Sequence, residues 1–387
     1  MRPPDNAGNP DDAFRLPPLI QSDSLTVSRL YKGKADPQAV LGGLLGKPFL
    51  DYRARWERAR SQTFVPPFPL HVDYEALGLC NYRCPMCPMS AMAGESDDAR
   101  NPKASLAPGA ADAADPSAQS GPAVLPTGGS LPLSKIRELL DEGAAKGQAA
   151  MGFGGLWEPL LLSGLPDLVA YGREKGLVDA MVNTNGSLLT SALSRDLIEA
   201  GLTRLMVSLD ALSPKTYSRM RPGGELRQVE GNIMAFLSER ERKKSQTPLL
   251  RVSFLVTSLN ESELPGFIGR WEGVADFLSI QRYGHYEGRT HKAMFPKKPH
   301  GEAPGGLCAQ PFKRLLVRHQ GDLLPCCDLS GMAMPMGNVF RTGIQEVWEG
   351  TAMSRLRESL RGKGTLTSVC RSCQSKYQDV ESDNDAT

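Results

Sequence analysis

Short apolar runs alternate with amphipathic stretches through the middle of the chain. The apolar runs predict six strands, over His71–Leu77, Ala149–Phe153, Ala180–Thr184, Arg204–Ser208, Leu250–Val256 and Phe277–Ile280. The stretches between them show the three- and four-residue spacing of amphipathic helices. They predict helices over Leu133–Lys146, Leu165–Lys175, Ser191–Ala200, Gln228–Lys243 and Glu261–Trp271. Strand–helix repetition of this kind predicts a parallel sheet with right-handed crossovers.

Six strands predict an α/β fold of the partial (β/α)6, TIM-like barrel type rather than a closed eight-stranded barrel. In such folds the functional residues lie at the carboxyl ends of the strands. A group of three cysteines follows the first predicted strand. We therefore expect the chemistry of the protein at this edge of the sheet.

The pattern changes from Cys308 onward. Two short apolar runs, Phe312–Arg318 and Leu323–Cys327, flank a polar turn and predict a β-hairpin, which a helix over Ile344–Leu360 follows. We divide the chain into an N-terminal extension that is partly disordered, a core, and a small α+β auxiliary-cluster domain. The bounds are 1–66, 67–300 and 301–380. The core contains a flexible insertion, 91–130, rich in Ala, Pro, Gly, Ser and Asp, which is either inert or a substrate lid.

Composition and charge exclude several classes of function. The 387 residues carry a net charge of +2, with acidic and basic residues interleaved, so neither nucleic acid nor a membrane surface is an expected partner. The first residues lack the pattern of a signal peptide, and no apolar run is long enough to span a bilayer. We expect a cytoplasmic protein, in which cysteines are metal ligands more often than disulfides.

The eight cysteines fall in three groups, and the first is Cys80, Cys84 and Cys87, with C-x3-C-x2-C spacing. Three thiolates on one loop hold three irons of a [4Fe–4S] cluster, and the remaining iron is open to an external amino and carboxylate group. A structural zinc site is closed by four ligands instead. At arbitrary spacing, zinc or buried thiols would be preferred, whereas this spacing after a first strand favours the cluster.

These residues resemble the cluster loop of the radical S-adenosylmethionine (SAM) superfamily, with Met86 where the family usually has an aromatic residue. The resemblance implies that Cys80, Cys84 and Cys87 hold a catalytic [4Fe–4S] cluster. It also implies reductive cleavage of SAM to a 5'-deoxyadenosyl radical, which takes a hydrogen atom from the substrate. A low-potential electron donor, such as flavodoxin or ferredoxin, is the implied partner.

Three later segments extend the resemblance to about residues 70–290. They are Gly154–Leu160, in which Leu156 and Trp157 interrupt the family's GGEP stretch, Asn183–Gly186, and Val207–Ala211 with Arg221–Gly224. The implied SAM-binding residues are Gly154, Gly155, Glu158, Asn185, Ser208, Asp210, Arg221 and Ile280.

The resemblance also suggests what these residues do. The two glycines let the backbone approach the methionine end of SAM. Glu158 neutralises its ammonium group, Ser208 and Asp210 bind ribose hydroxyls, Arg221 pairs with its carboxylate, and Ile280 packs on adenine. Taken singly, Ser208 and Asp210 are equally explained as helix caps, and Arg221 as a solvated charge.

The other two cysteine groups supply four more thiolates, from Cys308, Cys326, Cys370 and Cys373. Four cysteines close a second [4Fe–4S] cluster or a zinc ribbon. The segment resembles the auxiliary-cluster domains called SPASM and twitch, which favours the iron–sulfur cluster over zinc. Cys327 is interpreted as a small buried side chain, although an exchange of roles with Cys326 remains open. A closed cluster suits electron transfer, and therefore net oxidation, or structural support.

The sequence leaves several substrates open. We expect an oxidoreductase-type enzyme acting on a small polyol, sugar or aminocyclitol. The alternatives are a peptide-modifying enzyme and a non-catalytic iron–sulfur or zinc scaffold. Residues 1–66 lack the helix–helix–helix–strand pattern of a leader-peptide module, which disfavours a peptide. Arg282 and His285, after the sixth strand, are the expected substrate contacts, and an ordinary surface loop is an equal alternative.

Overall fold

The computed structural model describes residues 28–32, 36–87, 89–90, 129–283, 294, 308–326 and 329–375. The first 27 residues and most of the predicted insertion (91–128) lie outside this range. Cys327 and His285 also lie outside the described residues, and of Arg282 only the backbone is described.

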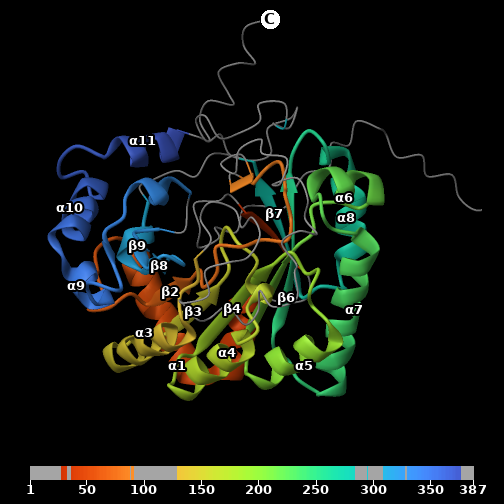
Figure 1. Ribbon diagram of the computed structural model, residues 1–387, viewed down its shortest axis with the longest axis horizontal. Coiled ribbons are helices and arrows are strands. Elements are labelled where there is room, and N and C mark those ends of the chain that lie inside the picture. The colour runs from red at the N-terminus through yellow and green to blue at the C-terminus, as the bar shows by residue number, and fades with distance from the viewer. Residues whose placement is uncertain are drawn as a thin grey trace, which may run out of the picture.

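A ten-stranded sheet runs through the described part of the chain, in the order β1-β7-β6-β5-β4-β3-β2-β8-β9-β10 (Figure 1). Its central strands pair in parallel, as the sequence predicts. They are β2 (His71–Tyr74), β3 (Ala150–Phe153), β4 (Asp179–Thr184), β5 (Arg204–Ser208), β6 (Leu249–Val256) and β7 (Phe277–Arg282). The first of them ends at Tyr74, earlier than predicted. The mixed α/β fold with a parallel, partial barrel is confirmed.

Helices connect these strands close to the predicted positions. They are α3 (Leu133–Lys146), α4 (Leu165–Glu174), α5 (Ser191–Glu199), α7 (Leu226–Arg242) and α8 (Leu264–Trp271). Each buries an apolar face; in α3 this face is Ile136, Leu139 and Leu140. A short helix, α6 (Pro214–Met220), was not predicted, because it is mostly polar. It begins where the Ser213 side chain accepts a hydrogen bond from the backbone N–H of Thr216.

The N-terminal elements close one end of the barrel. β1 (Ser28–Lys32) pairs antiparallel with β7, and α1 (Pro37–Arg60) follows it. The α1 side chains Phe49, Tyr52 and Trp56 share one hydrophobic core with the residues that begin β3, β6 and β7. Because α1 covers the amino ends of the strands, the carboxyl ends remain as the face where the functional loops meet.

The C-terminal region continues the barrel sheet rather than forming a separate appendage. β8 (Arg314–Val317) and β9 (Asp322–Leu324) form the predicted hairpin, to which β10 (Gly337–Asn338) adds. β8 also pairs in parallel with β2, which the sequence did not predict. The predicted single helix is two helices, α9 (Ile344–Glu349) and α10 (Thr351–Leu360), because Gly350 between them is extended, with ψ of 160°. The last described helix is α11 (Ser368–Ser375).

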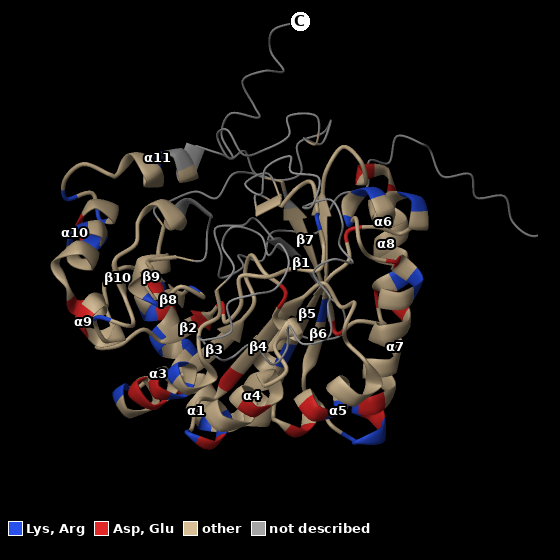
Figure 2. Ribbon diagram, in the orientation of Figure 1, with Lys and Arg blue, Asp and Glu red and all other residues tan. Residues whose placement is uncertain are grey.

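Figure 1 shows α9, α10 and α11 beside the β8–β9 end of the sheet and α7 and α8 at the opposite end. In Figure 2, acidic and basic residues alternate over the outer helices, and no broad region of one sign is visible among the described residues in that view. Within the described part of the chain, no helix combines the length and the apolar character needed to cross a bilayer.

Candidate active site

The cysteine loop, residues 80–87, is irregular backbone that follows β2 at the carboxyl edge of the sheet. The backbone N–H of Cys87 donates to the carbonyl of Cys84 over 2.9 Å, which closes a tight turn between these two ligands. The N–H of Tyr82 donates to Cys80 Sγ over 3.4 Å. Cys84 is buried, and Cys80 and Cys87 are partly buried. The local spacing therefore places three thiols on one short, compact segment.

Burial makes these thiols poor acids when no positive charge is bound. It raises the pKa of Cys80 to about 12, that of Cys84 to about 11, and that of Cys87 also above its ordinary value. Negative charge on Glu158 and on the other two thiols raises the pKa of Cys80 further. Thiolates are the form that binds iron, so the loop requires a cation to become charged.

A buried ion pair between Arg221 and Asp210 lies beside the cysteine loop. Arg221 Nη1 is 4.0 Å from Cys84 Sγ, while its Nη2 donates to Asp210 Oδ2. The other carboxylate oxygen of Asp210 accepts the backbone N–H of Leu255 over 2.7 Å. The structure thus brings together two residues that the sequence assigned to different ends of SAM. Asp210 does not cap a helix, and Arg221 is not a solvated charge.

Glu158 is almost completely buried, at 2 % exposure, and its carboxylate is held by three donors. They are the backbone N–H of Leu160 at 3.0 Å, Thr184 Oγ1 at 2.6 Å and the backbone N–H of Asn185 at 2.8 Å. Burial raises the pKa of Glu158. The carboxylate therefore joins the end of β4 to the segment after β3, and its predicted contact with the SAM ammonium remains a prediction.

A closed ring of side-chain hydrogen bonds links the cysteine loop to the end of β4. Asn185 Nδ2 donates to Asn81 Oδ1, Asn81 Nδ2 donates to Ser187 Oγ, and Ser187 Oγ donates to Asn185 Oδ1, over 2.7–2.8 Å. Such fully satisfied buried networks fix the positions of their members. Sequence reasoning named Asn185 but missed Asn81 and Ser187. Two features of the sequence could have indicated them: Asn81 is a polar residue inside the cysteine loop, and Ser187 directly follows the Asn-Gly pair at 185 and 186.

The two glycines after β3 are required by close packing. Gly154 has φ of 131°, and a Cβ there would lie 2.6 Å from the carbonyl oxygen of Asn183. Gly155 has φ of 124°, and a Cβ there would lie 2.5 Å from Glu75 Oε1. Their predicted contact with SAM is a further expectation.

The remaining predicted cofactor residues lie on strands. Ser208 is the last residue of β5, and Ile280 is buried within β7, which continues to Arg282. Both strands belong to the parallel sheet, so both positions are near the same carboxyl edge.

The C-terminal cysteine site consists of Cys308, Cys326, Cys370 and Cys373, which line one largely apolar cavity. Cys308 precedes β8, Cys326 follows β9, and the other two lie three residues apart on α11. Burial raises the pKa of Cys308 to about 12, and the thiols of Cys373 and Cys370 raise it further. Four cysteines that the sequence spreads over three places thus surround a single cavity.

Two family models match these two regions. The radical SAM superfamily matches residues 74–251, and the SPASM iron–sulfur cluster-binding domain matches residues 308–374. The chain belongs to the radical SAM superfamily. Its cofactors are accordingly a [4Fe–4S] cluster, SAM and an auxiliary iron–sulfur cluster, and the SPASM match decides against zinc in the C-terminal site.

Curated relatives match a part of this radical SAM chain. A probable GTP 3',8-cyclase of Methanococcus maripaludis is 32% identical over 123 residues, 32% of this chain and 39% of the relative. A GTP 3',8-cyclase of Limosilactobacillus fermentum is 36% identical over 112 residues, 29% of this chain and 32% of the relative. The chain therefore spans less than half the length of these two relatives.

Solved structures share the fold of this radical SAM chain. Streptococcus suis SuiB bound to S-adenosylmethionine has a TM-score of 0.56 at 14% identity, covering 84% of this chain and 76% of its own. The structure of anSMEcpe with bound AdoMet and Cp18Cys peptide has a TM-score of 0.53 at 14% identity, covering 79% and 86%. At these identities the likeness concerns the fold alone.

The residues of the radical SAM site fit the cofactors that the family implies. Three thiols on one short loop supply soft ligands for iron, and the neighbouring Arg221 offsets negative charge on a cluster of thiolates. Among the described residues, no three His, Cys, Asp or Glu side chains converge as ligands of one metal ion. In a [4Fe–4S] cluster each cysteine ligates a different iron, and the three cysteines of the loop are sufficient for three of the four irons.

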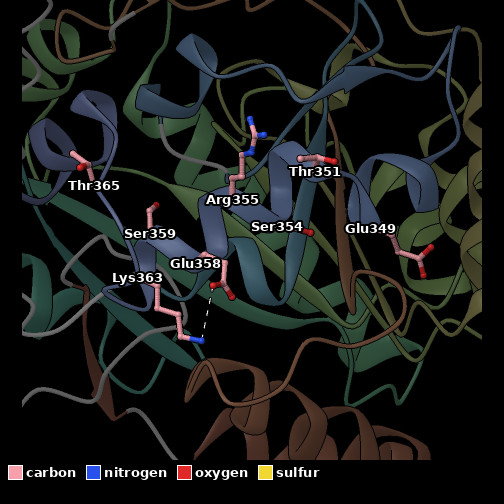
Figure 3. A pocket seen from close by; sticks show the side chains of 8 residues that line it. All are labelled: Glu349, Thr351, Ser354, Arg355, Glu358, Ser359, Lys363 and Thr365. Carbon is pink, nitrogen blue, oxygen red and sulfur yellow. Dashed lines mark ion pairs between the residues drawn. The ribbon is translucent and has the colours of Figure 1, made fainter.

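A large surface pocket lies away from both cysteine sites. Its walls come from α9, α10 and the residues after α10: Glu349, Thr351, Ser354, Arg355, Glu358, Ser359, Lys363 and Thr365 (Figure 3). Figure 3 shows the Lys363–Glu358 ion pair at its edge, with 3.9 Å between the charged atoms. No cysteine and no predicted SAM-binding residue lines it, so this pocket is not part of the radical SAM site.

Proposed function

We propose that the protein reductively cleaves SAM and removes a hydrogen atom from a small hydroxylated substrate, a polyol, sugar or aminocyclitol, with net oxidation of that substrate. When bound, the cluster and SAM together supply a 5'-deoxyadenosyl radical. The observation that carries the proposal is the cysteine loop, which holds three buried or partly buried thiols, without a fourth cysteine, at the carboxyl edge of a partial barrel.

The protein's own residues hold this site in a fixed geometry. Glu158 and the ring of Asn81, Asn185 and Ser187 tie the cysteine loop to the ends of β3 and β4. Arg221 places a buried positive charge next to Cys84. Fixed dipoles and charges in a site that excludes water act more strongly than they would in solvent.

The C-terminal cysteine site supports an oxidative outcome. Its four thiols surround one cavity, so they saturate a [4Fe–4S] cluster and leave no iron for substrate. Oxidation of an alcohol to a ketone releases a hydrogen atom, a proton and an electron. The hydrogen atom would pass to the deoxyadenosyl radical and the proton to water or a nearby base, and a cluster held by Cys308, Cys326, Cys370 and Cys373 would supply the acceptor for the electron. A flavodoxin or ferredoxin in the cytoplasm supplies the electron that starts each turnover.

The N-terminal segment supports a small substrate over a peptide. In its described part, β1 extends the sheet next to β7 and α1 packs under the amino ends of the strands. Both elements are therefore used for the fold: α1 lies at the amino ends of the strands, and β1 pairs along β7 from Phe277 to Gln281. The GTP 3',8-cyclase relatives do not define the substrate either, because the match covers about a third of this chain.

The experiment is an anaerobic assay of the reconstituted full chain with SAM, dithionite and a panel of deuterated polyols, sugars and aminocyclitols. We expect 5'-deoxyadenosine, with deuterium transferred to it from one class of alcohol and formation of the matching ketone. Transfer from a peptide library and not from the alcohols would replace the small substrate by a peptide. No SAM cleavage by a chain that retains its iron would contradict an enzymatic function.

A further inference from the structure

Trp157 occupies an unusual position between the two cysteine sites. It belongs to the two residues, Leu156 and Trp157, that interrupt the Gly-Gly…Glu-Pro segment after β3. The backbone on both sides is fixed: the N–H of Leu156 donates to Glu75 Oε1 over 2.9 Å, and the N–H of Glu158 donates to the carbonyl of Leu79 over 3.0 Å. Leu79 directly precedes the cysteine loop. The indole is therefore held at a defined place beside that loop.

The indole packs against groups from both halves of the protein. Trp157 and Met89 form a small hydrophobic group, and Cys80, Cys87 and Met332 pack against it. Met332 follows Gly331, where a Cβ would lie 2.7 Å from Cys326 Sγ. The ring of His319, from the β8–β9 turn, meets the indole edge-on, with ring centres 5.8 Å apart at 88°. The group of Trp157 and Met89 thus contacts the cysteine loop on one side and, through Met332, a segment next to Cys326 of the C-terminal cysteine site.

The polar atom of this side chain lacks a partner. Trp157 is 7 % exposed, and its Nε1–H makes no hydrogen bond to any described residue. Leaving a buried N–H unpaired costs roughly 1–3 kcal/mol, so a buried indole usually donates to something. The residue also lines a small cavity with Glu75, Gly154 and Glu158. The acceptor is therefore either a group bound at the cysteine loop or a water in that cavity.

We propose that the Nε1–H of Trp157 donates a hydrogen bond to an electron-rich acceptor of the cofactors assembled on the cysteine loop. The indole N–H is a neutral donor, and it stabilises a negatively charged acceptor. Two acceptors fit this description: a sulfur of the reduced cluster and the carboxylate of SAM. The packing of Cys80 and Cys87 against the group of Trp157 and Met89 favours the cofactors over the cavity water. This inference rests on the proposed function, because it requires a cluster on the loop.

The test compares Trp157→Phe, which keeps a ring and removes the N–H, with the matched control Trp271→Phe. Trp271 lies on α8 and is fully buried in the main core, and its Nε1–H likewise makes no hydrogen bond to a described residue. Both variants are reconstituted as the full chain, and iron per chain is required to equal that of the wild type. The cluster on the loop is identified as the one whose EPR signal changes when SAM is added, and it is titrated potentiometrically without SAM. SAM affinity is measured by equilibrium dialysis.

Hydrogen bonds to cluster sulfurs stabilise the more negative, reduced state. If a sulfur is the acceptor, Trp157→Phe lowers the reduced-to-oxidised ratio at a fixed potential by roughly two- to tenfold, as the loss of one hydrogen bond predicts. If the SAM carboxylate is the acceptor, the titration without SAM is unchanged and the Kd for SAM rises by about the same factor. Trp271→Phe changes neither quantity.

Unchanged potential and unchanged SAM affinity in Trp157→Phe would overturn the inference and assign the N–H to a water. If Trp157→Phe holds less iron, Trp157→Tyr takes its place in the same titration. Tyrosine has the ring of phenylalanine with an added O–H donor. Loss of the cluster from both variants would show that the indole acts through packing alone, which also overturns the inference. A wild type that binds its cluster but cleaves no SAM would contradict the proposed function and leave this titration interpretable.

Discussion

The two cysteine sites are built in opposite ways. The cysteine loop takes three thiols from one run of eight residues and surrounds them with polar partners, including Arg221 and Asn81. The C-terminal site takes four thiols from a turn, a hairpin end and a helix, and its cavity is mostly apolar. The difference follows from their tasks. A site that binds SAM needs an open iron and charged neighbours, whereas a closed site needs complete ligation and exclusion of water.

The largest effect is expected from removing the thiols of the cysteine loop. Replacement of Cys80, Cys84 and Cys87 by alanine should lower the iron content from about eight to about four atoms per chain. Formation of 5'-deoxyadenosine should fall to background, because no other site has an open iron. Cys327→Ala is the cysteine control and should keep both the iron and the activity. Retained SAM cleavage in the triple variant would mean that the two sites have been assigned the wrong roles.

Removing one thiol of the C-terminal cysteine site should have the opposite effect: that site loses its iron, and the cysteine loop keeps its function. Cys373→Ser, at a buried position, should lose about four irons and keep SAM cleavage measured without substrate. Substrate oxidation should stop, because the electron has no acceptor. Iron and zinc analysis of the same samples provides the check: a loss of about one zinc, with the iron unchanged, would make this site a structural ribbon.

Replacing Arg221 tests whether the buried charges beside the cysteine loop also stabilise the folded chain. Arg221→Met leaves the buried carboxylate of Asp210 without its partner, so we expect a loss of about 3–5 kcal/mol in the free energy of unfolding. Arg195→Met is the control, since Arg195 pairs with Glu239 at the surface, 40 % exposed, and should cost less than about 1 kcal/mol. Urea denaturation of the apo chain measures both. Equal, small losses would show that the Arg221 pair is solvated.

The smallest effect is expected on β2, the strand that pairs with β3 of the barrel and with β8 of the C-terminal region. Asp73 on β2 contacts His71 at 2.8 Å and, across the β2–β8 pairing, Arg314 at 3.6 Å. Burial alone would raise the pKa of Asp73, but Arg314 and then His71 outweigh it and lower the pKa from 3.8 to about 2. A lowered pKa contributes stability above the unfolded value, and this contribution is lost as the pH falls from about 4 to about 2.

Asp73→Asn should therefore cost about 2 kcal/mol at neutral pH, and the difference from the wild type should shrink below about pH 4. Urea denaturation at a series of pH values measures this difference. Asp196→Asn, at an exposed position on α5, is the control and should show little change at any pH. A difference that stays constant down to pH 2 would contradict the pairing of Asp73 with Arg314.

The cysteine loop could be predicted because its chemistry is local. Its spacing is written in consecutive residues, and the parallel strand pattern places it at the carboxyl edge of the sheet. The same pattern located five helices, since apolar periodicity reports which face of a helix is buried. The prediction failed where that signal is weak: α6 is polar, and the break at Gly350 is one residue long.

Contacts between distant residues could not be predicted in the same way. The sequence gives no register for pairing β8 with β2, and so did not indicate that the C-terminal hairpin continues the barrel sheet. It assigned Asp210 and Arg221 to different parts of SAM, although the turn after β5 brings them together. Likewise, the insertion of Trp157 was visible in the sequence, whereas its place beside Cys80, Cys87 and His319 was not.

The sequence by itself determined the type of fold, the family resemblance and the grouping of three candidate ligands on one loop, because hydrophobic periodicity and short cysteine spacing act over a few residues. Only the tertiary structure decided which side chains surround those ligands and how four scattered cysteines share one cavity. The reason is that burial, ion pairing and ring contacts depend on how strands far apart in the chain align. A single sequence does not encode that alignment as a local pattern.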